Sequence, residues 1–370
     1  MSVATGTSLV EARGLSKTFG GGGIFSRGGG VQAVRAVDAH LARGEAVGLV
    51  GESGSGKSTL GRLLLGLLPA TDGELRFDGQ DLKGMRRAEW RRLRRRMGIV
   101  FQDPMGSLDP RRRVGAQIAD GLDIHGLIPR AQHAARVAEL LEQVGLDPSH
   151  AVRFPHEFSG GQRQRIGIAR ALATGPDFLV ADEPVSALDV SIQAQVVALL
   201  DDLRRRLGLS LLFISHDLPV VRHLCDRVMV MYLGRVMEEG PSEAVFANPS
   251  HPYTRALLSA TPRLDPARRT ARILLAGDPP SPANPPSGCV FRTRCAYALP
   301  ACGQDIPALR PFGAPGQRVA CIRAEEIAAG TATPAAGPAR SGAVEDGLPE
   351  TLTAQPSSPE QPTPGGLVAG

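Results

Sequence analysis

The sequence predicts an α/β fold whose core is a largely parallel β-sheet, and three observations support this prediction. Apolar strand-like segments alternate with helical segments between residues 46 and 214. A glycine-rich loop, 51–56, joins one of these strands to a helix. Beyond residue 240 prolines accumulate and the periodic patterns disappear, which indicates a small and irregular C-terminal domain.

Strands and helices are expected in a definite order along the chain. Three short strands are expected at 9–12, 33–41 and 46–50, with a flexible glycine-rich hairpin loop at 20–30. A helix at 57–68 ends near Pro69, and a strongly basic segment at 86–96 precedes an apolar strand at 98–101. The pattern then predicts helices at 130–144, 163–172 and 191–207 and strands at 178–181 and 209–214. Residues 103–163 therefore form a helical insert between the two halves of the core.

The composition is that of a globular chain with a disordered end. The chain has 370 residues, 42% of them hydrophobic, which is enough for two or three domains. Residues 324–370 are rich in Ala, Pro, Gly, Ser and Thr and carry a net charge of −5, so we expect disorder there. The remaining residues carry a net charge of +10, which suits a nucleotide, a nucleic acid or an anionic membrane surface as a partner.

No segment of the sequence has the pattern of a membrane span or of a signal peptide. Runs of about 18 apolar residues are absent, and the first ten residues lack a charged region followed by a long apolar stretch. We therefore expect a cytosolic protein, or one attached to the cytosolic face of a membrane.

The glycine-rich loop fits the complete pattern of a phosphate-binding P-loop. It reads Gly51-Glu52-Ser53-Gly54-Ser55-Gly56-Lys57-Ser58 and continues into Thr59. Glycines let the backbone turn so that successive N–H groups face phosphate oxygens, and the N-terminus of the following helix adds its positive dipole. We expect Lys57 to reach the β- and γ-phosphates of a bound nucleotide, and Ser58 to ligate Mg²⁺.

Polar residues at the ends of three further strands supply the rest of a hydrolytic site. The strand at 178–181 delivers Asp182, an expected Mg²⁺ ligand, and Glu183, the expected general base for the attacking water. His216 follows the strand at 209–214, which is expected beside the acidic strand, and His216 is therefore expected at the γ-phosphate. Gln102 follows the strand at 98–101, where it can sense the γ-phosphate, contribute to the Mg²⁺ site and signal to the helical insert.

Four of the five cysteines lie close together in the proline-rich region: Cys289, Cys295, Cys302 and Cys321. In a reducing compartment such a cluster predicts a metal site before it predicts disulfides. The spacing lacks the tight cysteine pairs of zinc sites and so favours an iron–sulfur cluster. Zinc, and unligated thiols that pack a small domain, remain alternatives.

Further motifs resemble those of one family, the ABC ATPases. The segment Phe158–Arg165 resembles the ABC signature motif, with its residues Ser159, Gly160, Gly161 and Gln162. Ser186–Asp189 resembles the D-loop, which ends in Asp189. Gln102 matches the Q-loop glutamine, His216 the switch histidine, and Phe19 the aromatic residue that stacks on adenine. The motifs occur in the family's order between residues 9 and 240.

The resemblance implies a P-loop NTPase (RecA-like) core with ABC antiparallel β and α-helical subdomains, within an ATP-binding domain at residues 1–255. It also implies that two such domains close head to tail around two ATP molecules. Ser159 to Gln162 and Asp189 of one domain would then face the nucleotide held by the other. Closing and reopening would drive two transmembrane permease subunits between inward- and outward-facing states.

Within the family, the sequence resembles the ATPase subunits of oligopeptide and dipeptide importers. Segments 101–111 and 184–195 are similar to those subunits, and segments 251–258 and 285–295 are similar to their C-terminal extension, expected at residues 256–323. The resemblance implies a [4Fe-4S] cluster on the four cysteines. It also implies a second ATPase subunit, commonly a different paralogue, an extracytoplasmic solute-binding protein, and a place on the cytoplasmic face of the membrane.

Two alternative functions remain at this point. Close relatives with the same ATPase carry nickel or other small solutes, and the ATPase itself does not touch the cargo. A soluble ABC ATPase that acts on nucleic acid would explain the basic segment at 86–96. However, the chain has a single P-loop, and the 103–163 insert is too short for the long coiled coils of repair-type members. Nucleic acid is therefore not an expected partner.

Overall fold

Eight strands form the larger of two sheets in the computed structural model, which describes residues 8–20, 30–260, 273–275 and 277–333. The order across this sheet is β11-β12-β10-β9-β3-β8-β7-β6. Its parallel part consists of β6 (Met97–Val100), β7 (Phe178–Asp182), β8 (Ser210–Ile214), β3 (Ala46–Val50) and β9 (Arg227–Tyr232). The expected neighbourhood of the acidic strand and the strand before His216 is confirmed, because β7 and β8 are paired.

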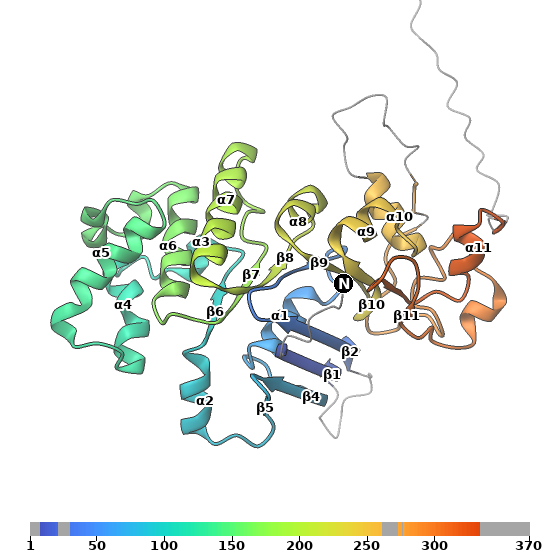
Figure 1. Ribbon diagram of the computed structural model, residues 1–370, viewed down its shortest axis with the longest axis horizontal. Helices are drawn as coiled ribbons and strands as arrows, with labels where there is room; N and C mark the ends of the chain where they lie inside the picture. Colours follow the sequence, from blue (N-terminus) through green and yellow to red (C-terminus); the bar gives the residue numbers. More distant parts are fainter. Residues whose placement is uncertain (1–7, 21–29, 261–272, 276, 334–370) are drawn as a thin grey trace, which may run out of the picture. The chain divides into compact units, whose positions relative to one another are not determined.

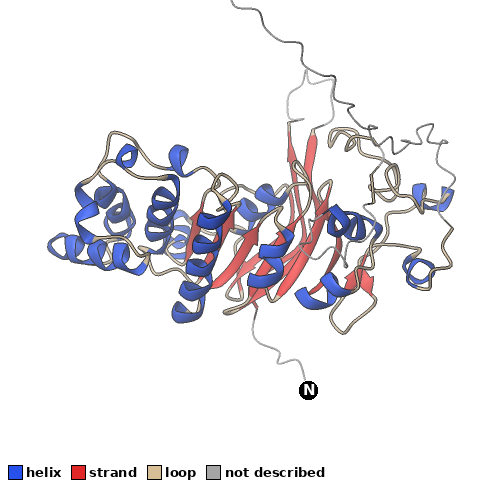
Figure 2. Ribbon diagram, turned by 90° about the horizontal axis from the view of Figure 1, so that it is seen from above, coloured by secondary structure: helices blue, strands red, loops and turns tan. Residues whose placement is uncertain are grey.

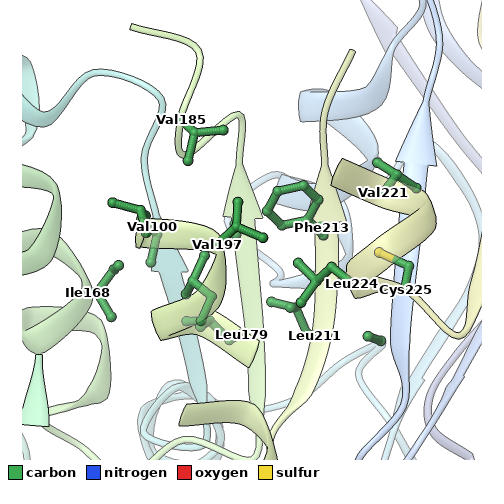
Figure 3. Packing of buried hydrophobic residues seen from close by; sticks show 14 of the residues in the cluster. Val100, Ile168, Leu179, Val185, Val197, Leu211, Phe213, Val221, Leu224 and Cys225 are labelled. Atoms are coloured by element: carbon green, nitrogen blue, oxygen red, sulfur yellow. The ribbon is translucent and has the colours of Figure 1, made fainter. Parts of the chain in front are cut away.

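Helices cover both faces of the parallel strands, which explains why every residue of β3, β7 and β8 is buried. Alternate residues point to opposite faces, so Leu179 and Val180 of β7 belong to different hydrophobic clusters. Leu179 belongs to a cluster that includes residues of α6 (Gly160–Leu172), α7 (Val190–Leu207) and α8 (Leu218–Leu224), as Figure 3 shows. Val180 packs with α1 (Lys57–Leu64) on the other face. Each fully buried aliphatic side chain of this kind contributes about 1.5–3 kcal/mol.

The smaller sheet is antiparallel and has the order β2-β1-β4-β5. It consists of β1 (Ser8–Phe19), β2 (Val31–Ala42), β4 (Asp72–Phe77) and β5 (Gln80–Asp81). β1 and β2 are longer than the strands expected from the sequence. Most of the loop predicted between them lies outside the described residues.

Helix α1 is shorter than predicted, because it ends at Leu64 and not at Leu68. Gly66 follows with a φ of +59°, and a Cβ there would lie 2.1 Å from the ring of Trp90. Trp90 belongs to α2 (Arg87–Arg94), the helix formed by the basic segment. The chain turns at Gly66, just after α1, and the absence of a side chain there lets the indole of Trp90 pack against the Gly66 backbone.

The helical insert lies beyond the β6 edge of the larger sheet (Figures 1 and 2). It contains α3 (Pro104–Ser107), α4 (Val114–His125), α5 (His133–Gln143) and short 3₁₀ turns at 148–152 and 155–157, and it leads into α6. Apolar residues on these helices form a core that continues into the main one: Val114, Ile118, Leu140, Leu141 and Ile166. None of the described helices is long and apolar enough to cross a membrane.

The C-terminal region extends the opposite edge of the larger sheet. β10 (Arg235–Pro241) pairs with β12 (Arg318–Val319), which pairs with β11 (Arg310–Pro311). Two helices, α9 (Ser242–Ala247) and α10 (Pro252–Ala260), and a 3₁₀ turn at 300–303 complete this region. All described residues belong to one compact unit.

The prediction of disorder from residue 324 onward was wrong for its first residues. Helix α11 spans Ala324–Ala328. It is held because Ala324 and Ile327 are buried and Glu326 makes a 2.6 Å ion pair with Arg323. The rest of the predicted tail, from residue 334, lies outside the described residues.

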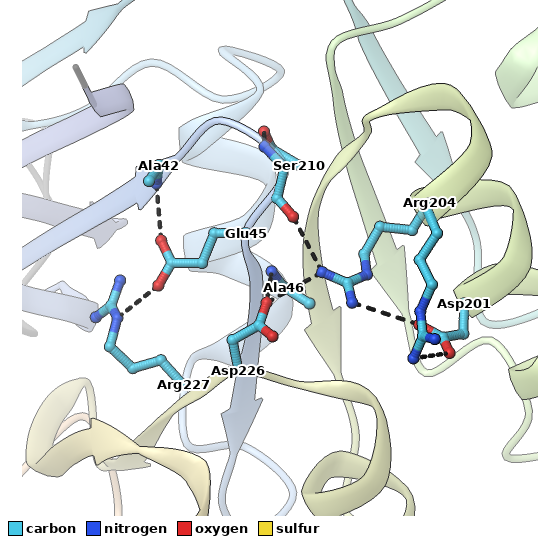
Figure 4. Close-up of polar contacts among 10 residues, drawn as sticks. Ala42, Glu45, Ala46, Asp201, Arg204, Ser210, Asp226 and Arg227 are labelled. Carbon is cyan, nitrogen blue, oxygen red and sulfur yellow. Dashed lines mark hydrogen bonds and ion pairs between the residues drawn. The ribbon is translucent and has the colours of Figure 1, made fainter. Parts of the chain in front are cut away.

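A network of charged groups ties together the amino ends of the parallel strands (Figure 4). Asp226 accepts a 2.8 Å hydrogen bond from the N–H of Ala46 and a 3.0 Å one from Arg204. Arg227 donates a 2.9 Å bond to Glu45. The polar residues predicted to form the site lie at the opposite edge of the sheet, where the parallel strands end.

Candidate active site

The predicted site residues follow four parallel strands that end at the same edge of the larger sheet. The P-loop follows β3, Gln102 follows β6, Asp182 ends β7 with Glu183 next to it, and His216 follows β8. These segments border one cavity of about 430 Å³. Its lining is formed by Ala33, Ser53, Gly54, Gly56, Lys57, Ser58, Thr59, Gln102, Glu183 and His216. Ligands of open parallel sheets bind at such carboxyl ends.

The P-loop has a backbone that only glycine permits at two positions. Gly51 has a φ of +151°, and a Cβ there would lie 2.1 Å from the carbonyl oxygen of Met231. Gly56 has a φ of +102°, and its Cβ would lie 2.2 Å from the carbonyl oxygen of Ala33. This close packing holds the loop curled at the start of α1, as a phosphate cradle requires.

Lys57 lies inside the loop, with only 4% of its surface exposed. Its Nζ donates 2.9 Å hydrogen bonds to the carbonyl oxygens of Gly51 and Glu52. Burial lowers the pKa of Lys57, while the carboxylates of Glu183, Asp182 and Glu52 act in the opposite direction. The ammonium group is thus held at the floor of the cavity that the loop encloses.

Oxygen donors suited to Mg²⁺ stand beside the P-loop. The hydroxyl of Ser58 donates a 2.7 Å hydrogen bond to Oδ1 of Asp182. Burial raises the pKa of Asp182, and the bond from Ser58 partly offsets that effect. A hydroxyl and a buried carboxylate next to a phosphate cradle fit the ligand preference of Mg²⁺, which also keeps phosphate and water ligands.

The carboxylate of Glu183 lies between two other predicted residues. Its Oε2 is 3.3 Å from Nε2 of Gln102 and 3.4 Å from Nδ1 of His216. Glu183 has a φ of +45°, an unfavourable value for a residue with a side chain. Its N–H donates to the carbonyl oxygen of Ile214 at 3.0 Å, which fixes this conformation and turns the carboxylate toward the cavity.

Other predicted residues lie away from this cavity. The signature segment forms the N-terminus of α6, where Ser159 and Gln162 form a reciprocal capping box. Asp189 is the residue before α7. None of the signature residues and neither Asp189 nor Phe19 lines the cavity. Ser159 and Gly160 are exposed, as is Phe19, whose ring lies 5.3 Å from Nζ of Lys17.

The four clustered cysteines converge on one small cavity of about 20 Å³. All four are free thiols. Burial raises the pKa of Cys295 to about 12 and that of Cys321 to about 11, with smaller contributions from the neighbouring sulfurs. Within the described ranges, no group of three or more His, Cys, Asp or Glu side chains has the geometry of a metal site.

Two residues of the C-terminal region were not predicted to belong to this site. The hydroxyl of Tyr253 accepts a 2.8 Å hydrogen bond from the N–H of Glu52. Nη1 of Arg294 donates a 2.6 Å hydrogen bond to the carboxylate of the same glutamate, Glu52. Both residues occur in segments that resembled the importer extension, but nothing in their spacing indicated a contact with the P-loop.

Comparison with known proteins agrees with this geometry. The family model of the ABC transporter matches residues 34–186, and that of the oligopeptide/dipeptide transporter C-terminal region matches residues 237–302. A dimeric cassette structure, MJ0796 in a post-hydrolysis state bound to ADP and Pi, is 30% identical with a TM-score of 0.57. It covers 63% of this chain and 98% of its own length.

Several curated relatives are similar over most of the chain. A putative peptide import ATP-binding protein of Brucella ovis is 57% identical over 86% of this chain and 99% of its own length. The oligopeptide transport ATP-binding protein AppF of Bacillus subtilis is 49% identical over 87% and 99%, respectively. OppF of Salmonella typhimurium, with the same description, is 52% identical over 80% and 89%.

Fold, site and relatives define an ABC ATPase, an ATP-binding protein that hydrolyses ATP for transport. Within that class, the chain belongs to the family of ATP-binding subunits of oligopeptide and dipeptide importers.

Proposed function

We propose that this chain powers the import of peptides through a membrane ABC transporter. The observation that supports this most strongly is that a P-loop cavity bordered by Gln102, Glu183 and His216 and the oligopeptide/dipeptide C-terminal region occur in one chain. The relatives named for peptide import are similar through both parts. No described contact favours nickel, another small solute or a nucleic acid as the cargo or partner.

We assign the chemistry of hydrolysis to the residues that line or border the cavity. P-loop N–H groups and Lys57 hold the phosphates, and Ser58, Asp182 and Gln102 contribute ligands to Mg²⁺. The ion supplies charge neutralisation at the phosphates. Glu183 orients the attacking water and accepts its proton, since its carboxylate faces the cavity. His216 and Gln102 hold Glu183 and sense the γ-phosphate, in agreement with their contacts to its Oε2.

A second ATPase subunit completes each site. The signature residues Ser159 to Gln162 form an exposed helix N-terminus that is suited to an anion but remote from the chain's own P-loop cavity. We propose that they, with Asp189, bind the nucleotide of the partner ATPase, a different paralogue. The dimeric form of the related cassette MJ0796 is consistent with this assignment. Phe19 is exposed enough to stack on adenine.

Two permease subunits are the proposed membrane partners. A groove of about 750 Å³ between the larger sheet and the helical insert is lined by Phe101, Gln102, Asp103 and Arg170, among others. Gln102 borders both this groove and the ATP cavity. Nucleotide binding could therefore be transmitted through Gln102 to a permease segment that binds in the groove. We propose that the chain works at the cytoplasmic face of the membrane, with a solute-binding protein on the other side.

We propose a structural [4Fe-4S] cluster on Cys289, Cys295, Cys302 and Cys321, in a C-terminal domain at residues 256–323 that follows the ATP-binding domain at 1–255. The four thiols line one cavity and match the number and type of ligands that such a cluster takes, although they do not stand in a metal-binding geometry in this structure. Anaerobically purified protein should contain about four iron atoms per chain. One zinc per chain, or no metal at all, would contradict the cluster.

The proposed function is tested by isolating the chain with its partners. Tagged Glu183→Gln protein should be recovered with Mg-ATP from solubilised native membranes, with Glu142→Gln, an exposed glutamate in the insert, as the matched control. Two permeases, a second ATPase and a peptide-binding protein are the expected partners. Recovery of nucleic acid or ribosomes instead would overturn the transport function, and a nickel-binding protein would overturn the peptide cargo.

A further inference from the structure

Glu52 of the P-loop is held through all three of its polar groups. Its N–H donates to the hydroxyl of Tyr253 at 2.8 Å, and its carbonyl oxygen accepts from Nζ of Lys57 at 2.9 Å. Its carboxylate pairs with Nη1 of Arg294 at 2.6 Å. Two of these three partners come from the C-terminal region, 201 and 242 residues away along the chain.

Both C-terminal partners are rigidly placed. Tyr253 is fully buried, and Arg294 has only 8% of its side chain exposed. The ring of Phe291 lies 5.3 Å from those of Tyr253 and Tyr232. Arg294 stands over the ring of Tyr232 at 6.0 Å and approaches its hydroxyl at 3.4 Å. A buried, mostly aromatic cluster therefore fixes the two groups that hold Glu52.

We propose that Arg294 and Tyr253 are positioning residues of the ATP site and that the C-terminal region sets nucleotide affinity through Glu52. The connection runs from Arg294 to the Glu52 carboxylate, and from the Glu52 carbonyl to the Lys57 ammonium. An ordered Glu52 presents the loop and Lys57 in one arrangement before nucleotide arrives. Less ordering entropy is then lost on binding, so affinity rises.

Three variants of the full chain test this, with Arg310→Gln as the matched control. Arg310 makes a 2.7 Å ion pair with Glu325 in the same C-terminal region but does not contact the P-loop. Arg294→Gln and Glu52→Gln should each raise the Kd for Mg-ATP about tenfold. The double variant should be no worse than Arg294→Gln alone, because both changes break the same contact. Arg310→Gln should bind Mg-ATP as the wild type does.

Tyr253→Phe provides a second measurement if Arg294→Gln folds poorly, because it removes only the hydroxyl. Without its acceptor, the Glu52 N–H should exchange with solvent faster, and the P-loop peptide should show this in hydrogen exchange while α5 does not. Wild-type affinity in Arg294→Gln, fully additive effects in the double variant, or unchanged exchange in Tyr253→Phe would each overturn the proposal.

Discussion

The hydroxyl of Ser58 lies 2.7 Å from the carboxylate of Asp182 and donates a hydrogen bond to it. The two residues are 124 positions apart. Ser58 lies in the segment after β3, and Asp182 is the last residue of β7; β8 lies between these two strands in the sheet. The bond joins the helix that follows the P-loop to the acidic strand, and so holds side by side the hydroxyl and the carboxylate that we propose as Mg²⁺ ligands. The hydrolytic site is therefore an arrangement of strand ends, and its chemistry depends on single residues at those ends.

Lys57→Ala should abolish measurable ATP binding. The ammonium group is buried at the cavity floor and is the only lysine in the lining of the described cavity. Each charge-assisted hydrogen bond to phosphate that is lost should cost about 1.5–3 kcal/mol, and the ammonium group can donate more than one. Titration calorimetry with Mg-ATP measures this, with the exposed Lys83→Ala as control. ATP hydrolysis by Lys57→Ala near the wild-type rate would disprove the cradle assignment.

Glu183→Gln should bind ATP but hydrolyse it about 10²–10⁴ times more slowly, since the amide cannot accept a proton from water. The variant keeps the size of the side chain and its contacts with Gln102 and His216. ATP-bound dimers should accumulate and elute earlier in size-exclusion chromatography. Turnover at the wild-type rate would remove Glu183 from the role of base.

His251 should make the protein less stable below neutral pH. The side chain is fully buried, which lowers its pKa to about 3 from 6.5, and its Nδ1 already accepts the N–H of Tyr253 at 3.0 Å. The unfolded chain binds a proton below pH 6.5 that the folded chain does not, so stability is complete above pH 6.5 and falls as the pH drops from 6.5 toward 3.

The slope of this loss reaches about 1.4 kcal/mol per pH unit. Urea unfolding at pH 7, 6 and 5 measures it, with His251→Asn as the comparison, because asparagine can still accept the Tyr253 N–H without titrating. Parallel slopes for the two proteins would show that His251 has no part in the pH dependence.

Gly66→Ala should be strongly destabilising, whereas Gly79→Ala should be mild. Both glycines have positive φ values, +59° and +76°. A Cβ at Gly66 would lie 2.1 Å from the ring of Trp90, but one at Gly79 meets nothing within 4 Å. We expect losses of about 3 kcal/mol and about 1 kcal/mol in the free energy of unfolding. Equal losses would show that the Trp90 contact is dispensable.

The positions of the strand-end residues could be predicted from the sequence alone, because the strands before them have recognisable apolar patterns and the motifs occur in a fixed order. An apolar strand followed by Asp182 and Glu183 predicts both a position and a chemistry, and the sheet brings it next to Ser58 and Gln102. The contacts of Arg294 and Tyr253 with Glu52 had no such signal. They arise from packing between segments more than 200 residues apart, in a region without periodicity.

Helix α11 shows the same limit on a smaller scale. Its composition resembles that of the segment after it, so the sequence predicted disorder for both. The helix forms because Ala324 and Ile327 are buried against the C-terminal region. Such burial depends on the tertiary fold and cannot be recognised in the local sequence.

Peptide uptake is the most direct test of the central claim that ATP hydrolysis at this site powers peptide import. Cells that normally make the protein would be deleted for its gene, supplied with wild type, Lys57→Ala or Glu183→Gln at equal levels, and given a radiolabelled oligopeptide. We predict that deletion abolishes uptake and that only the wild type restores it. Undiminished uptake after deletion, or restoration by Glu183→Gln, would contradict the account.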